Sequence, residues 1–223
     1  MATEVVIKRV YDQLKQQVMT YHIKPGTRLN IGHLADDLGV STTPVREVLN
    51  RLVSEGLIDD VPQIGFFVHH PTEHEIRNLY DLNRLLLDWS LGALRKGHLV
   101  TGLVRPPRLF PEPSPTEAEA QIQAEALVQI TEQLFNHVAS QSHNREIVRK
   151  IRNINDRLHY IRLHEPDFLP NAQTELLDLC RLYYQKNYRG LRDALKTYHD
   201  ARTALVENLL TLILSCECTG KAS

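Results

Sequence analysis

The sequence predicts a mainly α-helical protein in which an N-terminal winged helix-turn-helix is followed by an antiparallel all-helical bundle. Three observations predict this fold. Short helical segments precede two short apolar runs within residues 1–70, and helical periodicity fills most of the remaining chain. No stretch after residue 70 alternates as a strand does. We therefore expect a winged helix-turn-helix domain over residues 1–70 and an all-helical domain over residues 71–223.

The first expected element is an amphipathic helix over residues 5–21. Four apolar side chains fall four residues apart within it, which is the spacing of a buried helix face. They are Val6, Val10, Leu14 and Val18. This helix should end before the Pro25-Gly26 turn, and residues 27–29 leave room for only a small strand.

A helix-turn-helix is expected next. Asn30 can cap a helix over residues 31–38, and Gly39 should end it. Thr43 is a suitable N-cap for the following helix, with Pro44 at its first position, where a missing N–H does no harm. After that helix, the apolar runs 57–58 and 66–68 predict a two-stranded wing.

The second domain is expected to contain only helices and loops. Thr72 and Glu75 form a capping box for a helix that reaches about Lys96. Five prolines within residues 106–115 then forbid regular structure, so residues 97–115 should be a long loop. Four more helices are expected over residues 117–140, 144–164, 171–186 and 189–214.

Composition and charge exclude several classes of protein. The 223 residues include 26 Lys and Arg against 27 Asp and Glu, so the whole chain offers no net attraction to nucleic acid. No apolar run reaches the length of about 18 residues that a membrane span needs, and the first residues do not resemble a signal peptide. We therefore expect a cytoplasmic protein without membrane contact.

Four segments in order, residues 26–29, 34–52, 55–58 and 65–68, resemble the DNA-binding domain of GntR-superfamily transcription regulators. The junction at Pro71-Thr72 and the helical remainder resemble the FadR-like branch, whose C-terminal FCD domain binds a small effector. The resemblance implies a regulator and not an enzyme. It also implies that a homodimer binds a double-stranded DNA operator, with occupancy controlled by a small-molecule effector, a carboxylate or acyl metabolite, in the helical domain.

The expected DNA contacts surround the start of the third helix. A helix N-terminus offers free N–H groups to a phosphate, and nearby hydroxyls can donate as well. Arg46, on the first turn, can pair with a guanine through two hydrogen bonds, which the resemblance also implies. The alternative for Arg46 is a surface ion pair with Glu47 or Glu55. The residues expected at the DNA are Arg28, Ser41, Thr42, Thr43, Arg46, Arg51, Gln63 and Gly65.

The predicted DNA-binding domain departs from the family pattern in its charge. Thr42 stands where the family usually has arginine, and Gln63 and Ile64 stand at a wing tip that is usually basic. Residues 1–70 carry seven Lys and Arg against eight Asp and Glu. Since each neutralised phosphate adds affinity through counterion release, we expect weak non-specific binding and a shallow salt dependence. Two headpieces on one palindromic site would offset this weakness.

Many FCD domains hold a divalent metal with one Asp and three His, and this sequence lacks most of that set. Alignment on residues 142–144 places Thr131 and Phe135 where the Asp and the first His would be. Leu176 follows Glu175 where the next His would be, so only His199 matches. Because a metal site needs at least three protein donors, we expect no metal and no cofactor.

A bundle without a metal can still bind an effector through buried polar groups. The expected effector-binding residues are Arg84, Arg152, Asn155, His159, His199 and Arg202, although each arginine could equally lie on a solvated face. Two alternatives remain. One is a degenerate regulator that represses constitutively or serves as an interaction module, and the other, less favoured, is an all-α enzyme. The enzyme is disfavoured because no nucleophile–base pair, Gly-rich phosphate loop or paired bundle carboxylates are found in the sequence.

Overall fold

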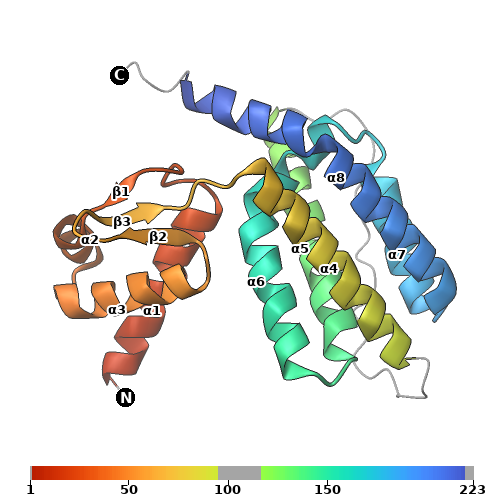
Figure 1. Cartoon of the computed structure of the whole chain (residues 1–223), viewed down its shortest axis with the longest axis horizontal. Coiled ribbons are helices and arrows are strands. Elements are labelled where there is room, and N and C mark those ends of the chain that lie inside the picture. The colour runs from red at the N-terminus through yellow and green to blue at the C-terminus, as the bar shows by residue number, and fades with distance from the viewer. Residues whose placement is uncertain (1, 95–116, 219–223) are drawn as a thin grey trace. The chain divides into compact units, whose positions relative to one another are not determined.

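The computed structural model describes residues 2–94 and 117–218 (Figure 1). The chain divides into two compact units, Met1–Thr72 and Glu73–Ser223. The proline-rich loop and the last residues of the first bundle helix, expected at residues 95–115, lie outside the described residues. Each unit has its own apolar core and is described by itself below.

The first unit is built on three helices, α1 (Ala2–Met19), α2 (Ile31–Leu38) and α3 (Thr42–Ser54). The expected face of α1 is buried, since Val10, Leu14 and Val18 are each at most 2% exposed. It packs on α3, whose inward residues complete the core. These inward residues are Val45, Val48, Leu49 and Leu52.

The helix-turn-helix is fixed by local backbone chemistry. Asn30 Oδ1 accepts hydrogen bonds from the N–H groups of Gly32 and His33 at 2.9 and 3.2 Å, which caps α2. Gly39 ends α2 in the left-handed region at φ 63°. The start of α3 differs from the expectation, because Ser41 is its N-cap and Pro44 its third residue. Proline is tolerated there because the first N–H groups of a helix have no partner within the helix.

A three-stranded antiparallel sheet completes the first unit. Its strands β1 (Arg28–Leu29), β2 (Ile58–Val61) and β3 (Gly65–Val68) lie in the order β1-β3-β2. Register pairs Ile58 with Val68 and Arg28 with Phe67. Phe66 and Val68 are buried in the core of the unit. The predicted wing and small strand are therefore confirmed.

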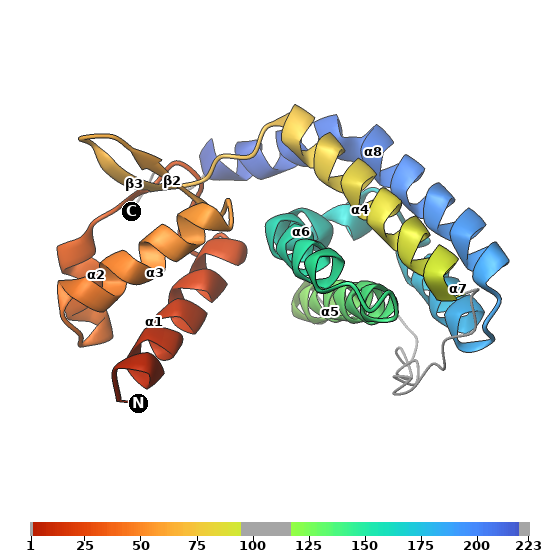
Figure 2. The same ribbon diagram turned by 60° about the horizontal axis from the view of Figure 1, so that its bottom comes forward.

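The second unit is helical throughout its described part. Figures 1 and 2 show α4 (Glu73–Leu94) antiparallel to α8 (Tyr188–Cys218), and α5 (Glu117–Ser140) antiparallel to α6 (Arg145–Leu163). Helix α7 (Ala172–Tyr184) packs on α8. The predicted helices are confirmed to within a few residues at their ends. An unexpected 3₁₀ turn, Glu165–Asp167, follows α6.

The core of the second unit combines an apolar cluster with buried charges. Leu87, Phe135, Ile151 and Leu191 are fully buried in that cluster. Charged and polar side chains are also buried, among them Arg202 at 2% exposure. Buried charges are unusual and need partners, so they are considered with the functional site. Within the described ranges, no helix is both long enough and apolar enough to cross a membrane.

The left-handed conformation of Gly39 yields a stability prediction. Gly39→Ala should lower the free energy of unfolding by about 1 kcal/mol, because a Cβ is disfavoured in this region. Gly92→Ala is the matched control. It lies within α4 with open space around its Cα, so it should raise the free energy of unfolding by about 0.5–1 kcal/mol. Urea denaturation followed by circular dichroism measures both, and equal effects would contradict the assignment.

Candidate nucleic-acid interface and buried polar cluster

One face of α3 is exposed and polar. Thr42, Thr43, Arg46, Glu47 and Asn50 all lie on solvent-exposed positions of this helix. Among the residues that the structure describes, Arg46 forms no hydrogen bond or ion pair, so the alternative pairing with Glu47 or Glu55 is absent there. The guanidinium therefore keeps all its donors for an external acceptor.

The N-terminus of α3 is not capped by a side chain. Ser41 is extended at φ −74° and ψ 165° but makes no capping hydrogen bond, whereas Asn30 caps α2 with two. Ser41, Thr42 and Thr43 are exposed at this end. Free backbone N–H groups, the positive end of the helix dipole and three hydroxyls together suit a phosphate oxygen.

Arg51 differs from Arg46, although the sequence placed both at the DNA. Its guanidinium carbon lies 3.7 Å from the centre of the Tyr11 ring, and its Nε lies 3.2 Å from Glu55 Oε1. Lys15 Nζ also contacts Glu55, at 3.2 Å. Arg51 therefore joins α3 to α1 within this unit, and the structure does not group it with the free Arg46.

Arg28 also has a partner within the unit, in the wing. Its Nη2 donates a hydrogen bond to the carbonyl oxygen of Ile64 at 2.7 Å. Gln63 and Gly65 lie on either side of Ile64 with positive φ angles of 65° and 121°. Arg28 thus holds the wing turn, in which Gln63 is exposed. The neighbouring strand β2 exposes Asp59, which a phosphate would repel.

Asn50 is a candidate that the sequence interpretation missed. It lies four residues after Arg46 on the same exposed face of α3. An asparagine amide can pair with adenine through two hydrogen bonds in the major groove. The spacing of four residues from Arg46 could have identified Asn50 from the sequence, because residues four apart lie on the same face of a helix.

In the second unit, Arg202 lies at the centre of a buried polar cluster. Its Nε donates to Glu165 Oε2 at 2.9 Å, and its Nη1 donates to Glu175 Oε2 at 2.6 Å. Tyr80 Oη donates to the other oxygen of Glu165 at 2.6 Å. Burial raises the pKa of Tyr80, which keeps this donor protonated. The buried charges therefore compensate one another.

A second group of partners surrounds Arg162. Its Nη1 donates to Asn155 Oδ1 at 2.9 Å and lies 3.9 Å from Glu132 Oε1. His159 Nδ1 contacts the same carboxylate oxygen at 3.0 Å. Burial lowers the pKa of His159, but the hydrogen bond and negative charge of Glu132 outweigh burial, so the pKa is raised overall. Glu132 therefore interacts with both His159 and Arg162.

His199 lies in a different environment. Its Nδ1 donates to the carbonyl oxygen of Leu195 at 2.7 Å, and its Nε2 lies 2.9 Å from Asn83 Oδ1. Burial lowers the pKa of His199 to about 3, so the ring is neutral near pH 7. A neutral ring that donates from Nδ1 can only accept at Nε2. We therefore assign the Asn83 amide with its NH₂ group turned toward the ring.

The structure brings together most of the expected effector residues. Asn155, His159, His199 and Arg202 are all buried in the helical unit, whereas Arg84 is half-buried. Arg152 is exposed on α6 and does not join them. The sequence interpretation missed the side chains that partner these residues, which are Asn83, Glu132, Asn136, Arg162, Glu165 and Glu175. Charged residues at inward helix positions, such as 162 between Ile161 and Leu163, were the signal.

The aligned metal positions hold side chains that already have other contacts. The Phe135 ring stacks on His199 with centroids 5.8 Å apart, and Thr131 Oγ1 donates to the carbonyl oxygen of Leu127 at 2.8 Å. Across the described residues, no three His, Cys, Asp or Glu side chains converge as a metal site would require.

The first unit, with an uncapped recognition helix and a wing, defines a DNA-binding protein of the winged helix-turn-helix class. Comparison with known proteins supports this class. Residues 6–68 match the family described as bacterial regulatory proteins, gntR family. The Nta operon transcriptional regulator of Aminobacter aminovorans is 31% identical over 147 residues, covering 65% of this chain and 67% of the relative. The chain belongs to the gntR family of DNA-binding transcription regulators and is not an enzyme.

Further similarities agree in fold. The transcriptional regulator McbR of Escherichia coli K12 is 40% identical over 86 residues, which are 39% of this chain and 38% of the relative. The structure of E. coli McbR/YncC matches with a TM-score of 0.61 at 20% identity, covering 91% and 97% of the two chains. A GntR regulator from Rhodococcus sp. RHA1 matches with a TM-score of 0.66 at 19% identity and the same coverage. The two structures show that the fold is shared over both units.

The Arg202 cluster predicts a large loss of stability on substitution. Arg202→Met should lower the free energy of unfolding by about 3–5 kcal/mol, because Glu165 would stay buried without its charge partner. Arg152→Met removes an exposed arginine from α6 and should change the free energy by less than about 0.5 kcal/mol. Urea denaturation measures both. A change below about 1 kcal/mol for Arg202→Met would contradict this role.

The depressed pKa of His199 predicts a pH dependence of stability. The unfolded state takes up this proton below about pH 6.5, whereas the folded state does so only near pH 3. The stabilisation is therefore complete above pH 6.5 and is lost as the pH falls. The wild type should lose about 2 kcal/mol more than His199→Gln between pH 7 and pH 5. Parallel denaturation curves at the two pH values test this, and equal losses would contradict it.

Proposed function

We propose that this regulator binds its operator as a homodimer in the cytoplasm and that a small-molecule effector in the helical unit controls its occupancy. We also propose that the chain belongs to the FadR-like branch, with the helical unit as its FCD-type effector-binding and dimerisation domain. The observation that carries the DNA-binding surface is the uncapped N-terminus of α3 beside the unpartnered Arg46. The helical second unit is compatible with the branch.

The proposed DNA contacts are of two kinds: contacts to phosphates that position the protein on the duplex, and a contact to a base edge that recognises the sequence. Ser41, Thr42, Thr43 and the α3 N-terminus hold a phosphate, and Arg46 pairs with a guanine edge. Arg28, Gln63 and Gly65 present the wing, and Arg51 supports α3 from behind. Because seven cations face eight acids in residues 1–70, one headpiece gives little affinity. Two DNA-binding units of a homodimer on one palindromic operator would together supply the affinity that a single unit lacks.

The effector proposal draws on the buried polar cluster. Asn155, His159, His199 and Arg202 already bind other side chains, so an effector there would have to exchange partners with them. Of the proposed effector residues, Arg84 at Nε and His159 at Nε2 each have a buried nitrogen without a hydrogen-bond partner in the described residues. Effector binding would favour one of two arrangements of the headpieces, so that their spacing fits or does not fit the operator.

A degenerate regulator without effector control is the second candidate. The observation that favours it is the mutual compensation of the interior charges, together with Phe135 at an aligned ligand position. Such a protein would bind its operator constitutively or act as an interaction module. Any ligand that raises its melting temperature by mass action and changes DNA binding would exclude this candidate.

Arg46 should distinguish base reading from general phosphate attraction. Arg46→Ala should weaken binding to the DNA upstream of the gene by about tenfold to a hundredfold, since one bidentate base contact is lost. Arg46→Lys keeps the charge but not the paired donors, so it should lose specificity while keeping non-specific affinity. Gel retardation at several salt concentrations, with unrelated DNA as competitor, measures both.

The wild type provides the decisive control. Purified protein that shows no salt-sensitive retardation of this fragment would overturn the proposed operator binding. Equal behaviour of Arg46→Ala and the wild type would instead remove Arg46 from the contact surface.

A further inference from the structure

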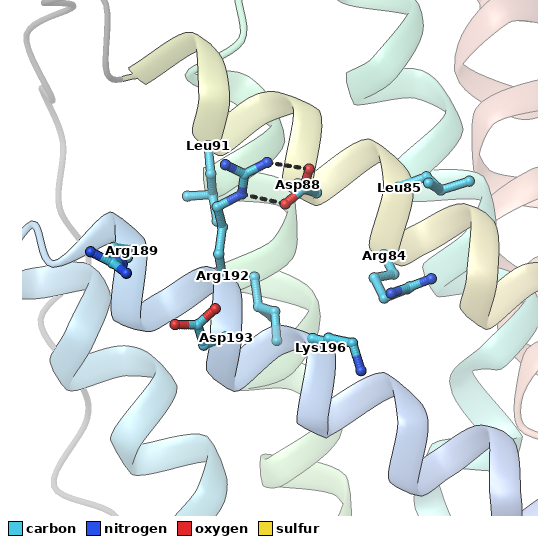
Figure 3. Close-up of a pocket in the computed structure, with 9 residues that line it drawn as sticks. Arg84, Leu85, Asp88, Leu91, Arg189, Arg192, Asp193 and Lys196 are labelled. Atoms are coloured by element: carbon cyan, nitrogen blue, oxygen red, sulfur yellow. Dashed lines mark hydrogen bonds and ion pairs between the residues drawn. The ribbon is translucent and has the colours of Figure 1, made fainter.

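A cavity of about 530 Å³ lies between α4 and α8 (Figure 3). This volume falls within the range of about 300–1,000 Å³ that small-molecule sites occupy. The space beside Arg162 and Arg202 in the interior measures only about 20 Å³, which is room for about one water. By volume, an organic ligand fits the α4–α8 cavity and does not fit the interior cluster as it stands.

Part of the cavity wall is apolar. Leu85 and Leu91 of α4 and Leu195 of α8 line it. Leu91 and Leu195 are almost fully buried, whereas Leu85 is 60% exposed. Trp89, one turn further along α4 and outside the cavity lining, is 54% exposed. Covering an exposed apolar side chain such as Leu85 is favourable, because it removes apolar surface from water. The wall therefore suits an organic body.

Charged side chains surround this apolar wall. Figure 3 shows the Asp88–Arg192 ion pair between the two helices, with Arg84 and Lys196 on one side and Arg189 on the other. Lys196 is held by Asp200 at 2.5 Å. Four cations thus stand against Asp88, Asp193 and Asp200, which leaves one positive charge in excess. A ligand with a single negative group would neutralise it.

Arg84 is the cation best placed to receive that group. It is half-buried, and its Nε is shielded from solvent without an acceptor in the described residues. Its guanidinium forms no ion pair there, unlike those of Arg192 and Arg202. Leaving a buried donor unpaired is unfavourable, so an anion that reaches Arg84 would supply the missing acceptor.

We propose that the α4–α8 cavity binds a small organic anion, with its acidic group on Arg84 and its apolar body against Leu85, Leu91 and Leu195. This inference rests on the proposed effector control, because it names the site and the chemistry of the effector. It leaves the paired charges of the interior in place.

The chain carries its own reporter for this test, since Trp89 is its single tryptophan. We would titrate the full chain with sodium octanoate and follow tryptophan fluorescence and melting temperature. The neutral analogue 1-octanol and the apolar-free anion citrate serve as ligand controls. Octanoate should give a saturable fluorescence change and a rise in melting temperature, and both controls should give much smaller effects.

Variants locate the site. Arg84→Gln should weaken octanoate binding by about tenfold or more, and the exposed rim variant Arg189→Gln should weaken it in the same direction. Arg189 has no partner in the described chain, so its loss should not disturb folding. Arg152→Gln, an exposed arginine on α6, is the matched control and should bind as the wild type does.

The outcomes separate this inference from the proposed function. Absence of octanoate binding, equal binding of 1-octanol, or unchanged binding by both Arg84→Gln and Arg189→Gln would overturn the site. DNA retardation measured on the same preparation tests the regulator by itself. Retardation without octanoate binding refutes only the cavity, and octanoate binding without retardation supports the cavity while refuting operator binding.

Discussion

The compensation of Glu165 by Arg202 is the interaction on which the helical unit depends. It gathers Tyr80 from α4, Glu175 from α7 and Arg202 from α8 around one 3₁₀ turn. Apolar burial supplies most of the driving force for packing, but it is not directional. Hydrogen bonds between buried charges have strict geometry, so this cluster fixes how the helices meet. The buried leucines of the apolar cluster fill the rest of the core of this unit.

Arginine serves two purposes in the DNA-binding unit. Arg28 and Arg51 hold the wing turn and the α1–α3 contact, respectively. Arg46 has no such duty among the described residues. The charge of this unit is balanced, and its recognition helix keeps one free guanidinium. Such a unit is better suited to recognising a DNA base than to binding the phosphate backbone of DNA through many ion pairs. Long-range attraction should therefore contribute little to its association with DNA.

Local signals such as capping and turn residues predicted the secondary structure well, whereas contacts between residues that are distant in the sequence could not be predicted. Asn30 and Gly39 act on the backbone next to them, so α2 was placed to the residue, and the wing strands were placed to within about three residues. The predicted N-cap of α3, Thr43, was wrong, because the run Ser41-Thr42-Thr43 offers three possible caps and the sequence alone does not choose among them. For the site, the exposure of Arg46 could be anticipated from the spacing of Val45 and Leu49. The partners of Arg202 could not, since Glu165 and Glu175 lie 37 and 27 positions away in the sequence and their approach depends on helix packing.

The shared carboxylates of the interior have an evolutionary consequence. Losing Arg202 alone strands Glu165 and Glu175, and losing either acid leaves an arginine undercompensated. Intermediates along such a path would fold poorly, so the members should change together or persist together in descendants of this chain. We therefore expect the residues of this buried ion-pair cluster to covary among related sequences and not to be strictly invariant.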